Sequence, residues 1–392
     1  MRFFPRPIVA SLSWALACAF LPFTARGDEG PWPVARLDAA WSYATGGPVF
    51  STAAHQGADL YIGSDDGHVH ALDAHTGAPR WTQELSGPVR TRPWIDGAEI
   101  LVVSGNDLAA LSRESGRVIW QFKPEPATGA APSDRWDYHQ SSPVIAGGLV
   151  TYGAGNGRFY AVDRANGKER FSCPVDAAAS IRSTPAYADG TLYFGDWNGV
   201  IYAVDAANGS RRWTFNTLSG PKPYPQFGGV VSSLVVQDGR LYFGARNPDV
   251  FCLDAVTGKE IWKFTAENGS WTAGTPTVDG GSLFITGSDD HRVHALDAAT
   301  GAVRWSCDLG QNMFIAPLVV GTRVIVTDAN SYADDAGAGR LHVLDRATGR
   351  RLRTFAIGGN AGASSPVLVE GRVVVGSEDG HVRAFDLATL LQ

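Results

Sequence analysis

Residues that could bind a small ligand recur shortly before a series of predicted strands. They combine cationic, amide and aromatic side chains: Arg90, Arg92, His139, Gln140, Arg182, Trp271 and Phe314. A guanidinium group binds a carboxylate through two parallel hydrogen bonds. If the loops that carry these residues meet around a common opening, they would form a pocket for a planar anion.

Two long loops would add aromatic walls to this candidate pocket. The loops span residues 123–140 and 216–229, and their aromatic side chains include Trp136, Tyr138, Tyr224 and Phe227. A second interpretation needs no ligand: Arg90 and Arg182 bond loop carbonyl groups, and the aromatic residues only pack the loops together. The sequence leaves both interpretations open.

Three histidines at equivalent positions of a repeated pattern are candidate metal ligands: His70, His294 and His342. His68 lies two residues before His70, so that both would share one face of a strand. Other copies of the pattern have an aromatic residue at this position, as at Tyr160. Because the histidines belong to different repeats, they are not expected to converge on one ion. We predict half-buried strand residues and no metal site.

A third insert, residues 330–340, contains Asp334 and Asp335. Paired carboxylates suit calcium, which prefers oxygen ligands, but a solvated loop is the expectation here. The insert falls between the second and third strands of its repeat, and we expect it on the face opposite the candidate pocket.

Signatures of common enzyme classes are missing from the sequence. It contains no GxSxG, HExxH or GxxxxGK[ST] motif and no GxGxxG before a helix. The chain after its first 27 residues keeps Cys173, Cys252 and Cys307, with no CxxC or CxxCH. An odd number of cysteines without these motifs predicts neither a c-type haem nor a disulfide framework. Each cysteine is expected to be a small buried hydrophobe.

The first 27 residues read as a secretory signal peptide. Arg2 and Arg6 precede an apolar run, and small residues stand before Asp28. Two alternatives remain, a lipoprotein signal with lipidation at Cys18 and an uncleaved anchor. We expect an N-terminal lead-in over residues 28–37 and one domain over residues 38–392, exported to the periplasm or secreted.

The charge balance disfavours nucleic-acid binding. The 392 residues include 33 basic and 39 acidic side chains, which gives a formal charge of −6. Cleavage after residue 27 would remove three arginines and no acid, so the charge would become −9. A protein that neutralises phosphates needs the opposite sign.

One short segment repeats along the chain and identifies the architecture. DAHTGAPRW begins at Asp73, and related segments begin at Ser112, Asp163, Asp205, Asp254, Asp297, Asp345 and, cut short, Asp386. Residues 183–205 show what precedes each copy: three short strands rich in aliphatic and aromatic residues, separated by Asp-Gly and Asn-Gly turns. Each unit is therefore a four-stranded antiparallel meander of the size of a propeller blade.

Aromatic residues on the fourth strands count the blades. They are Trp41, Trp81, Trp120, Phe171, Trp213, Trp262 and Trp305, with Leu352 at the eighth position. No three strands precede Trp41, and no fourth strand follows the last three strands, residues 364–386. We predict an all-β, eight-bladed propeller that the N-terminal strand closes, with the seven aromatic residues docked between blades.

Repeats of the form D-A-x-T-G-x-x-x-W on four-stranded blades resemble the quinoprotein-type, PQQ-binding-like propeller family over residues 38–388. The chain looks most like the uncharacterised secreted and BamB-like members of this family. For a PQQ-dependent dehydrogenase, the resemblance would imply adjacent cysteines and a calcium site with a catalytic aspartate. The chain has no adjacent cysteines, so PQQ and calcium are cofactors that only the resemblance suggests.

These observations favour an exported, non-catalytic platform that binds an envelope protein or a small anionic ligand. One alternative is a PQQ-dependent alcohol or sugar dehydrogenase. Another is a BamB-like scaffold of outer-membrane β-barrel assembly, whose membrane association would need lipidation at Cys18. A monomer is expected in each case.

Overall fold

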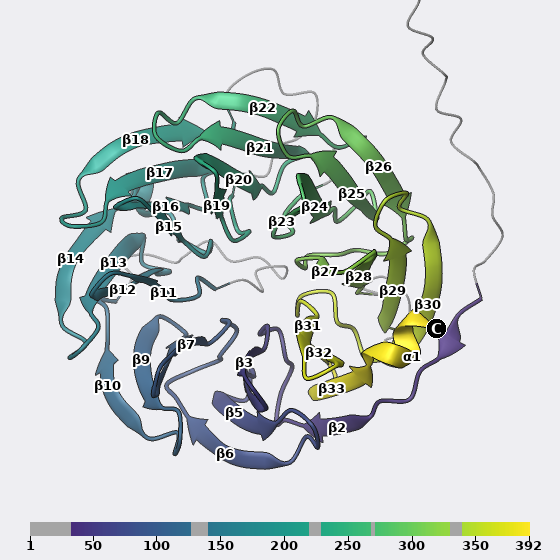
Figure 1. Cartoon of the computed structure of the whole chain (residues 1–392). Helices are drawn as coiled ribbons and strands as arrows, with labels where there is room; N and C mark the ends of the chain where they lie inside the picture. The colour runs from purple at the N-terminus through teal and green to yellow at the C-terminus, as the bar shows by residue number, and fades with distance from the viewer. Residues whose placement is uncertain (1–32, 127–139, 219–228, 268–270, 330–338) are drawn as a thin grey trace, which may run out of the picture. The chain divides into compact units, whose positions relative to one another are not determined.

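Each sequence repeat folds into a four-stranded antiparallel sheet because tight glycine turns separate its strand-forming segments. In the repeat from Ala186 to Asn216, Gly190 and Gly199 adopt φ angles of 71° and 82°, which side chains with a Cβ rarely tolerate. The computed structural model describes residues 33–126, 140–218, 229–267, 271–329 and 339–392. Residues 34–392 form one unit, in which eight sheets surround a central axis (Figure 1).

Blades 1 to 4 follow one another along the chain, each numbered from its innermost strand outward. Blade 1 contains β3 (Ala54–Gln56), β4 (Asp59–Gly63), β5 (His68–Asp73) and β6 (Pro79–Glu84). Blade 2 contains β7 (Trp94–Asp96), β8 (Glu99–Ser104), β9 (Asp107–Ser112) and β10 (Val118–Phe122). Blade 3 contains β11 (Val144–Ala146), β12 (Leu149–Gly153), β13 (Arg158–Asp163) and β14 (Glu169–Pro174), and the 3-10 turn η1 (Asp176–Ala178) follows it. Blade 4 contains β15 (Ala186–Ala188), β16 (Thr191–Gly195), β17 (Val200–Asp205) and β18 (Arg211–Asn216).

Blades 5 to 8 complete the ring. Blade 5 contains β19 (Val235–Gln237), β20 (Arg240–Gly244), β21 (Asp249–Asp254) and β22 (Glu260–Thr265). Blade 6 contains β23 (Thr277–Asp279), β24 (Ser282–Thr286), β25 (Arg292–Asp297) and β26 (Val303–Asp308). Blade 7 contains β27 (Leu318–Val320), β28 (Arg323–Thr327), β29 (Gly339–Asp345) and β30 (Arg351–Gly358). Blade 8 contains β31 (Val367–Val369), β32 (Arg372–Gly376), β33 (His381–Asp386) and, as its outer strand, β2 (Trp41–Ala44).

The predicted closure of the ring by the N-terminal strand is confirmed. β2 pairs antiparallel with β33, with Trp41 opposite Ala384 and Ala44 opposite His381. Strands from near the two ends of the described chain thus share blade 8, and β33 is not left as an open sheet edge.

The fourth-strand tryptophans dock against the turn of the following blade. The ring of Trp41 lies where a Cβ on Gly77 would come within 2.6 Å, and its Nε1 donates a hydrogen bond to the carbonyl of Ala74 over 2.9 Å. Trp81, Trp120, Trp213, Trp262 and Trp305 make the same carbonyl bond one blade further on each time. Glycine is needed in these turns because each has a φ near 70° and an indole covers it.

Phe171 takes the tryptophan position in blade 3. Its ring lies 2.6 Å from a Cβ built on Gly209, but it has no N–H to donate. The Sγ of Cys173 instead lies 3.2 Å from the carbonyl oxygen of Gly209. At this junction between blades 3 and 4, the aromatic ring still packs on the glycine turn. The indole hydrogen bond is replaced by a weaker bond from the thiol of Cys173.

The junction between blades 7 and 8 is built differently. β1 (Ala35–Arg36) adds a fifth strand to blade 7, parallel to β30. The helix α1 (Leu387–Leu391) follows β33 where the other repeats have their glycine turn, and it buries Leu390 against Phe355. The sequence analysis predicted neither the added strand nor this short helix.

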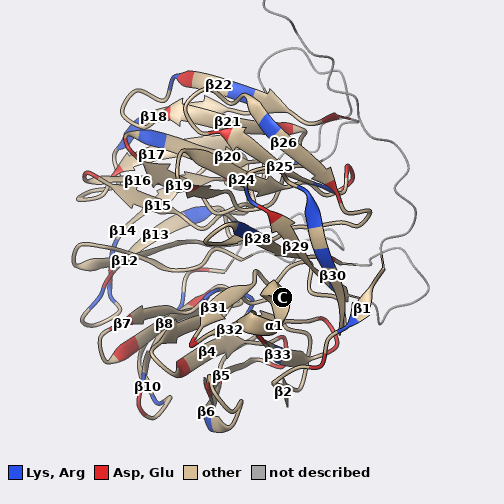
Figure 2. Cartoon of the chain, turned by 45° about the vertical axis from the view of Figure 1, so that its right-hand side comes forward, with Lys and Arg blue, Asp and Glu red and all other residues tan. Residues whose placement is uncertain are grey.

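Antiparallel order places the connections on two faces of the ring. The front face carries the connections between blades and the turns between second and third strands. The rear face carries the other two turns of each blade. Charged side chains of both signs occur along the outer strands and turns (Figure 2).

The insert of blade 7 begins and ends on the front face. Residues 330–338, with Asp334 and Asp335, lie outside the described residues. The Oγ1 of Thr327, at the end of β28, donates to the carbonyl of Ala361, and the amide of Ala329 donates to that of Asn312. Both acceptors belong to connections between blades. The prediction that the insert lies on the face opposite the candidate pocket concerns residues outside the described ranges. Its described ends lie on the front face, because a second-to-third turn returns to the side on which the blade is entered.

Within the described residues, no helix is both long enough and apolar enough to cross a membrane. The prediction of a signal peptide over residues 1–27 falls outside them.

Candidate functional site: the central channel

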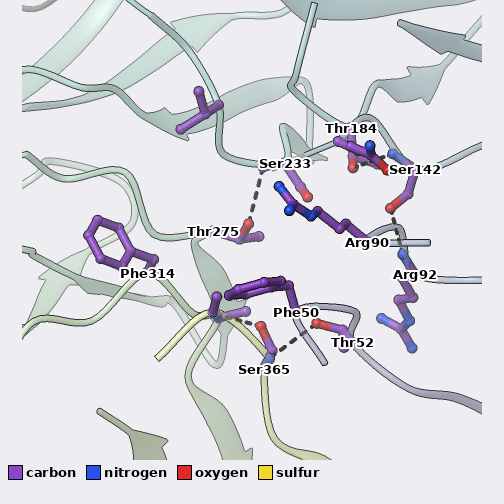
Figure 3. A pocket seen from close by; sticks show the side chains of 14 residues that line it. Phe50, Thr52, Arg90, Arg92, Ser142, Thr184, Ser233, Thr275, Phe314 and Ser365 are labelled. Carbon is purple, nitrogen blue, oxygen red and sulfur yellow. Dashed lines mark hydrogen bonds between the residues drawn. The ribbon is translucent and has the colours of Figure 1, made fainter. Parts of the chain in front are cut away.

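Two rings of side chains from the connections between blades line the central channel. Each connection ends with the pattern seen in Arg90-Thr91-Arg92, in which the first and third residues face the axis and the second is buried. A cavity of about 140 Å³ lies between the rings, and residues of all eight connections line it (Figure 3). The sequence analysis identified four of these lining residues: Arg90, Arg92, Gln140 and Phe314.

Most residues at the third position carry a hydroxyl group and form what we call the hydroxyl ring: Thr52, Ser142, Thr184, Ser233, Thr275 and Ser365. Neighbouring connections bond one another through these groups. The amides of Arg92 and Ser142 donate to the side chains of Ser142 and Thr184 over 2.9 and 3.1 Å. The amides of Ser233 and Ser365 donate likewise to Thr275 and Thr52. The ring is thus held together across the blades by amide-to-hydroxyl bonds.

The buried second position fastens each connection to its own blade. The amide of Gly195 donates to the Oγ of Ser183 over 2.8 Å, and that Oγ in turn donates to the carbonyl of Gly195. Ser51, Ser141, Ser232 and Ser364 accept the equivalent amide bond. The sequence signal for both positions is a pair of hydroxyl residues, often before proline, at the same place in the repeat. The sequence analysis missed it because it looked for charged and aromatic residues.

Arg90 forms an ion pair across two blades. Its Nε and Nη2 donate to the two carboxylate oxygens of Asp65 over 2.8 and 2.7 Å. Its guanidinium carbon also lies 5.1 Å from the centre of the Phe50 ring. Asp65 stands in the turn between β4 and β5, so the pair joins blade 1 to the connection that enters blade 2. Arg90 bonds a carboxylate here, rather than only the loop carbonyls that the second interpretation foresaw.

Arg92 has a different environment from Arg90. Its side chain is exposed to the channel and points away from Arg90 (Figure 3). Among the described residues, no carboxylate lies within ion-pair distance of its guanidinium group. The surrounding blades reduce its hydration, and this desolvation lowers the pKa of Arg92. Only its backbone amide, which donates to Ser142, takes part in the ring.

Arg182 and Trp271 are on the front face but are not among the residues that line the 140 Å³ cavity. Arg182 lies against the turn of blade 3, where a Cβ on Gly155 would come within 3.5 Å of its Nη1. Trp271 packs near Phe314, and its ring centre lies 4.3 Å from the guanidinium carbon of Arg246. Trp136, Tyr138, His139, Tyr224 and Phe227 lie outside the described residues, so their part in the pocket stays a prediction.

The three histidines that resembled metal ligands each bind a carboxylate of their own blade. His294 lies 2.8 Å from Asp290 through Nε2 and 2.8 Å from the hydroxyl of Ser306 through Nδ1. His342 is arranged in the same way with Asp328 and Thr354, at 3.0 and 3.1 Å. Imidazole, hydroxyl and carboxylate are the groups of a hydrolase triad, but both imidazoles and both carboxylates are almost fully buried, and only Ser306 is partly exposed.

His70 completes a third such set with a hydroxyl from another blade. Its Nε2 lies 3.1 Å from Asp66, and its Nδ1 lies 3.1 Å from the hydroxyl of Tyr43, on β2 of blade 8. Burial lowers the pKa of His70, against the opposing effect of Asp66. Since each imidazole is committed to one blade or blade junction, these sets serve to fix the strands.

The described residues show no cluster of side chains of the kind that binds a metal ion. They contain no group of three or more His, Cys, Asp or Glu residues that could hold a metal ion, whereas calcium takes six to eight oxygen ligands. Cys173, Cys252 and Cys307 are all free and stand in different blades. Burial raises the pKa of Cys252 to about 12 and that of Cys173 to about 11, which suits buried hydrophobes rather than reactive thiols.

Curated relatives match only parts of the chain. A serine/threonine-protein kinase AfsK of Streptomyces griseus is 31% identical over 164 residues, which cover 40% of this chain and 19% of that protein. The outer membrane protein assembly factor BamB of Yersinia pestis is 29% identical over 135 residues, 33% of this chain and 34% of that protein. This chain thus spans about a third or less of the length of these relatives.

Solved structures share the fold over most of the chain. BamB from Moraxella catarrhalis superposes with a TM-score of 0.70 at 18% identity and covers 89% of this chain and 99% of its own. A quinohemoprotein alcohol dehydrogenase from Comamonas testosteroni has the same TM-score at 15% identity, over 90% of this chain and 76% of its own. Because an outer membrane protein assembly factor and an alcohol dehydrogenase match equally well, and both are less than 20% identical, these likenesses establish the fold alone.

The family model described as outer membrane protein assembly factor BamB matches residues 25–225, 198–291 and 246–389. These ranges together span the eight blades. The chain belongs to this BamB-like family of PQQ-like β-propeller repeats.

Proposed function

We propose that the protein is a non-catalytic scaffold of the cell envelope, exported by its N-terminal segment, that holds a partner protein on its front face. Family membership supports a binding role. Inside the blades, groups that resemble catalytic residues are buried and used for structure, as in the Asp328–His342–Thr354 set. The closed ring gives the connections of the front face a fixed framework, which favours binding because little order must be gained.

A stack of three side chains on the front face carries this proposal. The guanidinium of Arg246 lies between two indoles, 4.4 Å from the ring centre of Trp197 and 4.3 Å from that of Trp271. Arg246 is buried, and both indoles are partly exposed. Cation–π contacts of this kind hold the rings in place before a partner arrives. Tryptophan and arginine are also the residue types that most often dominate binding energy at protein interfaces.

The stack joins three separate segments of the chain. Trp197 stands in the turn between β16 and β17, Arg246 in the turn between β20 and β21, and Trp271 in the connection that enters β23. A partner that covers the stack would therefore contact blades 4, 5 and 6 at once. Such a footprint suits a folded protein better than a small metabolite.

Site-specific photo-cross-linking in living cells tests this proposal. A photoreactive residue replaces Asp289, which is exposed beside Trp271 on the front face, or Val256, which is 79% exposed on the rear face. We expect one defined adduct with an envelope protein from position 289 and none from position 256. The double change Trp197→Ala and Trp271→Ala should remove that adduct without unfolding the chain.

Two results would contradict the scaffold. Equal adducts from both positions would show that the front face is not a specific surface. Dye reduction by the purified chain that depends on added PQQ and calcium would instead establish a dehydrogenase.

A further inference from the structure

A second, larger cavity lies beside the hydroxyl ring, along the innermost strands of blades 1 to 5. Its volume is about 630 Å³, which is within the usual range for sites that bind small molecules. These strands run from the front face toward the rear face, so the cavity extends from the ring in the rear direction. Trp94 and Tyr187, 39% and 38% exposed, belong to its wall with Ile95, Ile145 and Val236.

Among the described residues, Arg92 is the one permanently charged residue that lines this cavity, and it stands at the inner end because it also lines the smaller cavity. In the described part of the chain, no aspartate or glutamate lines either cavity. A guanidinium group that has no carboxylate partner among the described residues can pair with the carboxylate of an entering ligand. Arg90, in contrast, has its carboxylate in Asp65.

The two connections that follow Arg92 around the ring carry hydroxyl groups that can donate. Ser142 and Thr184 each use the side-chain oxygen to accept a backbone amide. A hydroxyl that accepts in this way still has its own proton to give. No acceptor for these two protons is found among the described residues. Two hydroxyl donors and a guanidinium group therefore lie on neighbouring connections, which is a donor set that suits an anion.

We propose that this cavity binds a small amphiphilic carboxylic acid, with its carboxylate at Arg92 and the adjoining hydroxyls. The apolar body of the acid would lie along the wall that contains Trp94 and Tyr187. The inference goes beyond the proposed scaffold function, since it concerns the channel rather than the front-face stack, and each can fail without the other.

The probe is decanoate, used below its micelle concentration. Its binding is measured by calorimetry and by the change in tryptophan fluorescence, to which Trp94 in the cavity wall should contribute. We expect binding to the wild-type chain, and at least about 10-fold weaker binding to Arg92→Gln, as for the loss of a charged hydrogen bond. Arg117→Gln, at an exposed side chain in the turn between β9 and β10 that lines neither cavity, is the matched control and should leave the affinity unchanged.

Three comparisons can overturn the proposal. Decanoate that binds Arg92→Gln as tightly as wild type would show that the carboxylate is not recognised there. Acetate or inorganic phosphate that binds as tightly as decanoate would remove the role of the apolar wall. A peptide with an apolar C-terminus that binds more tightly than decanoate, and loses its affinity on amidation, would replace the small acid by a protein end.

Discussion

The sets inside the blades and the ring in the channel use similar polar groups in opposite ways. In the His342 set, imidazole, hydroxyl and carboxylate satisfy one another and are fully enclosed. In the channel, neither the proton of the Ser142 hydroxyl nor the guanidinium group of Arg92 has a partner in the described ranges: the hydroxyl only accepts an amide, and no described carboxylate reaches Arg92. Polar groups that complete each other stabilise a fold, whereas groups left incomplete at a cavity are available to a ligand. The histidine sets are therefore assigned to structure and the channel ring to binding.

Deleting β2, which closes blade 8 and completes the His70 set, should have the largest effect on stability. A chain that begins at residue 47 lacks β2, and with it Trp41, which is 8% exposed, and the hydroxyl that Tyr43 provides to His70. Loss of a buried tryptophan alone typically lowers stability by about 3–5 kcal/mol. We expect a large fall in the melting temperature and association through the exposed edge of β33. A monomeric truncated chain with an unchanged melting temperature would contradict the closure of blade 8 by β2.

Removing the imidazole of the His342 set should cause the second largest loss of stability. His342→Ala leaves the fully buried carboxylate of Asp328 with the amide of Arg340 but without its imidazole. Breaking a buried pair of this kind costs roughly 3 kcal/mol or more. Chemical denaturation of the purified variant measures the loss. His75→Ala, at a half-exposed side chain, should change the free energy of unfolding by less than about 0.5 kcal/mol. Equal effects of the two changes would remove the structural role of the set.

Acid should weaken the His70 set to a smaller extent. Burial is the main cause that lowers the pKa of His70. Asp66 opposes this effect, and the like charge of His68 lowers the pKa further. The pKa of Asp66 is also lowered: burial raises it, but the amides of Gly46 and His68 outweigh burial. The folded chain thus binds a proton at His70 less readily than the unfolded chain. The contribution is complete above the unfolded pKa of about 6.5 and is lost as the pH falls toward the folded value.

Replacement by the residue found in other repeats tests this pH dependence. Between pH 7.5 and 5.5, the wild-type chain should lose more unfolding free energy than His70→Tyr, which has no imidazole to titrate. The comparison requires denaturation curves of both proteins at both pH values. A steeper loss in the variant would mean that His70 is protonated more easily in the fold than outside it.

The blades could be predicted from the sequence because their signal repeats. The glycine turn and the tryptophan four residues later recur along the chain, and each copy strengthens the assignment of the others. The junction of blades 7 and 8 could not be predicted, because α1 and β1 occur once and replace the repeated turn.

The residues that line the channel were predicted only in part, because the sequence does not show whether a charged side chain forms an ion pair within the fold. Arg90 and Arg92 stand two positions apart in the same loop, yet Arg90 is paired with Asp65, whereas Arg92 has no carboxylate partner in the part of the chain that the structure describes. That difference depends on the turn of a neighbouring blade. The hydroxyl ring also has a clear sequence pattern. However, serine and threonine are common before strands, and only the closed propeller shows that these residues lie side by side around the channel.

The most direct test of the distinction between closed sets and open ring compares two variants in two assays. His294→Gln and Arg92→Gln are each measured for the free energy of unfolding and for decanoate affinity. We predict that His294→Gln loses stability but keeps its affinity, and that Arg92→Gln keeps its stability within about 0.5 kcal/mol but binds at least about 10-fold more weakly. A loss of stability without a loss of affinity in Arg92→Gln would contradict the account, because it would make Arg92 one more structural residue.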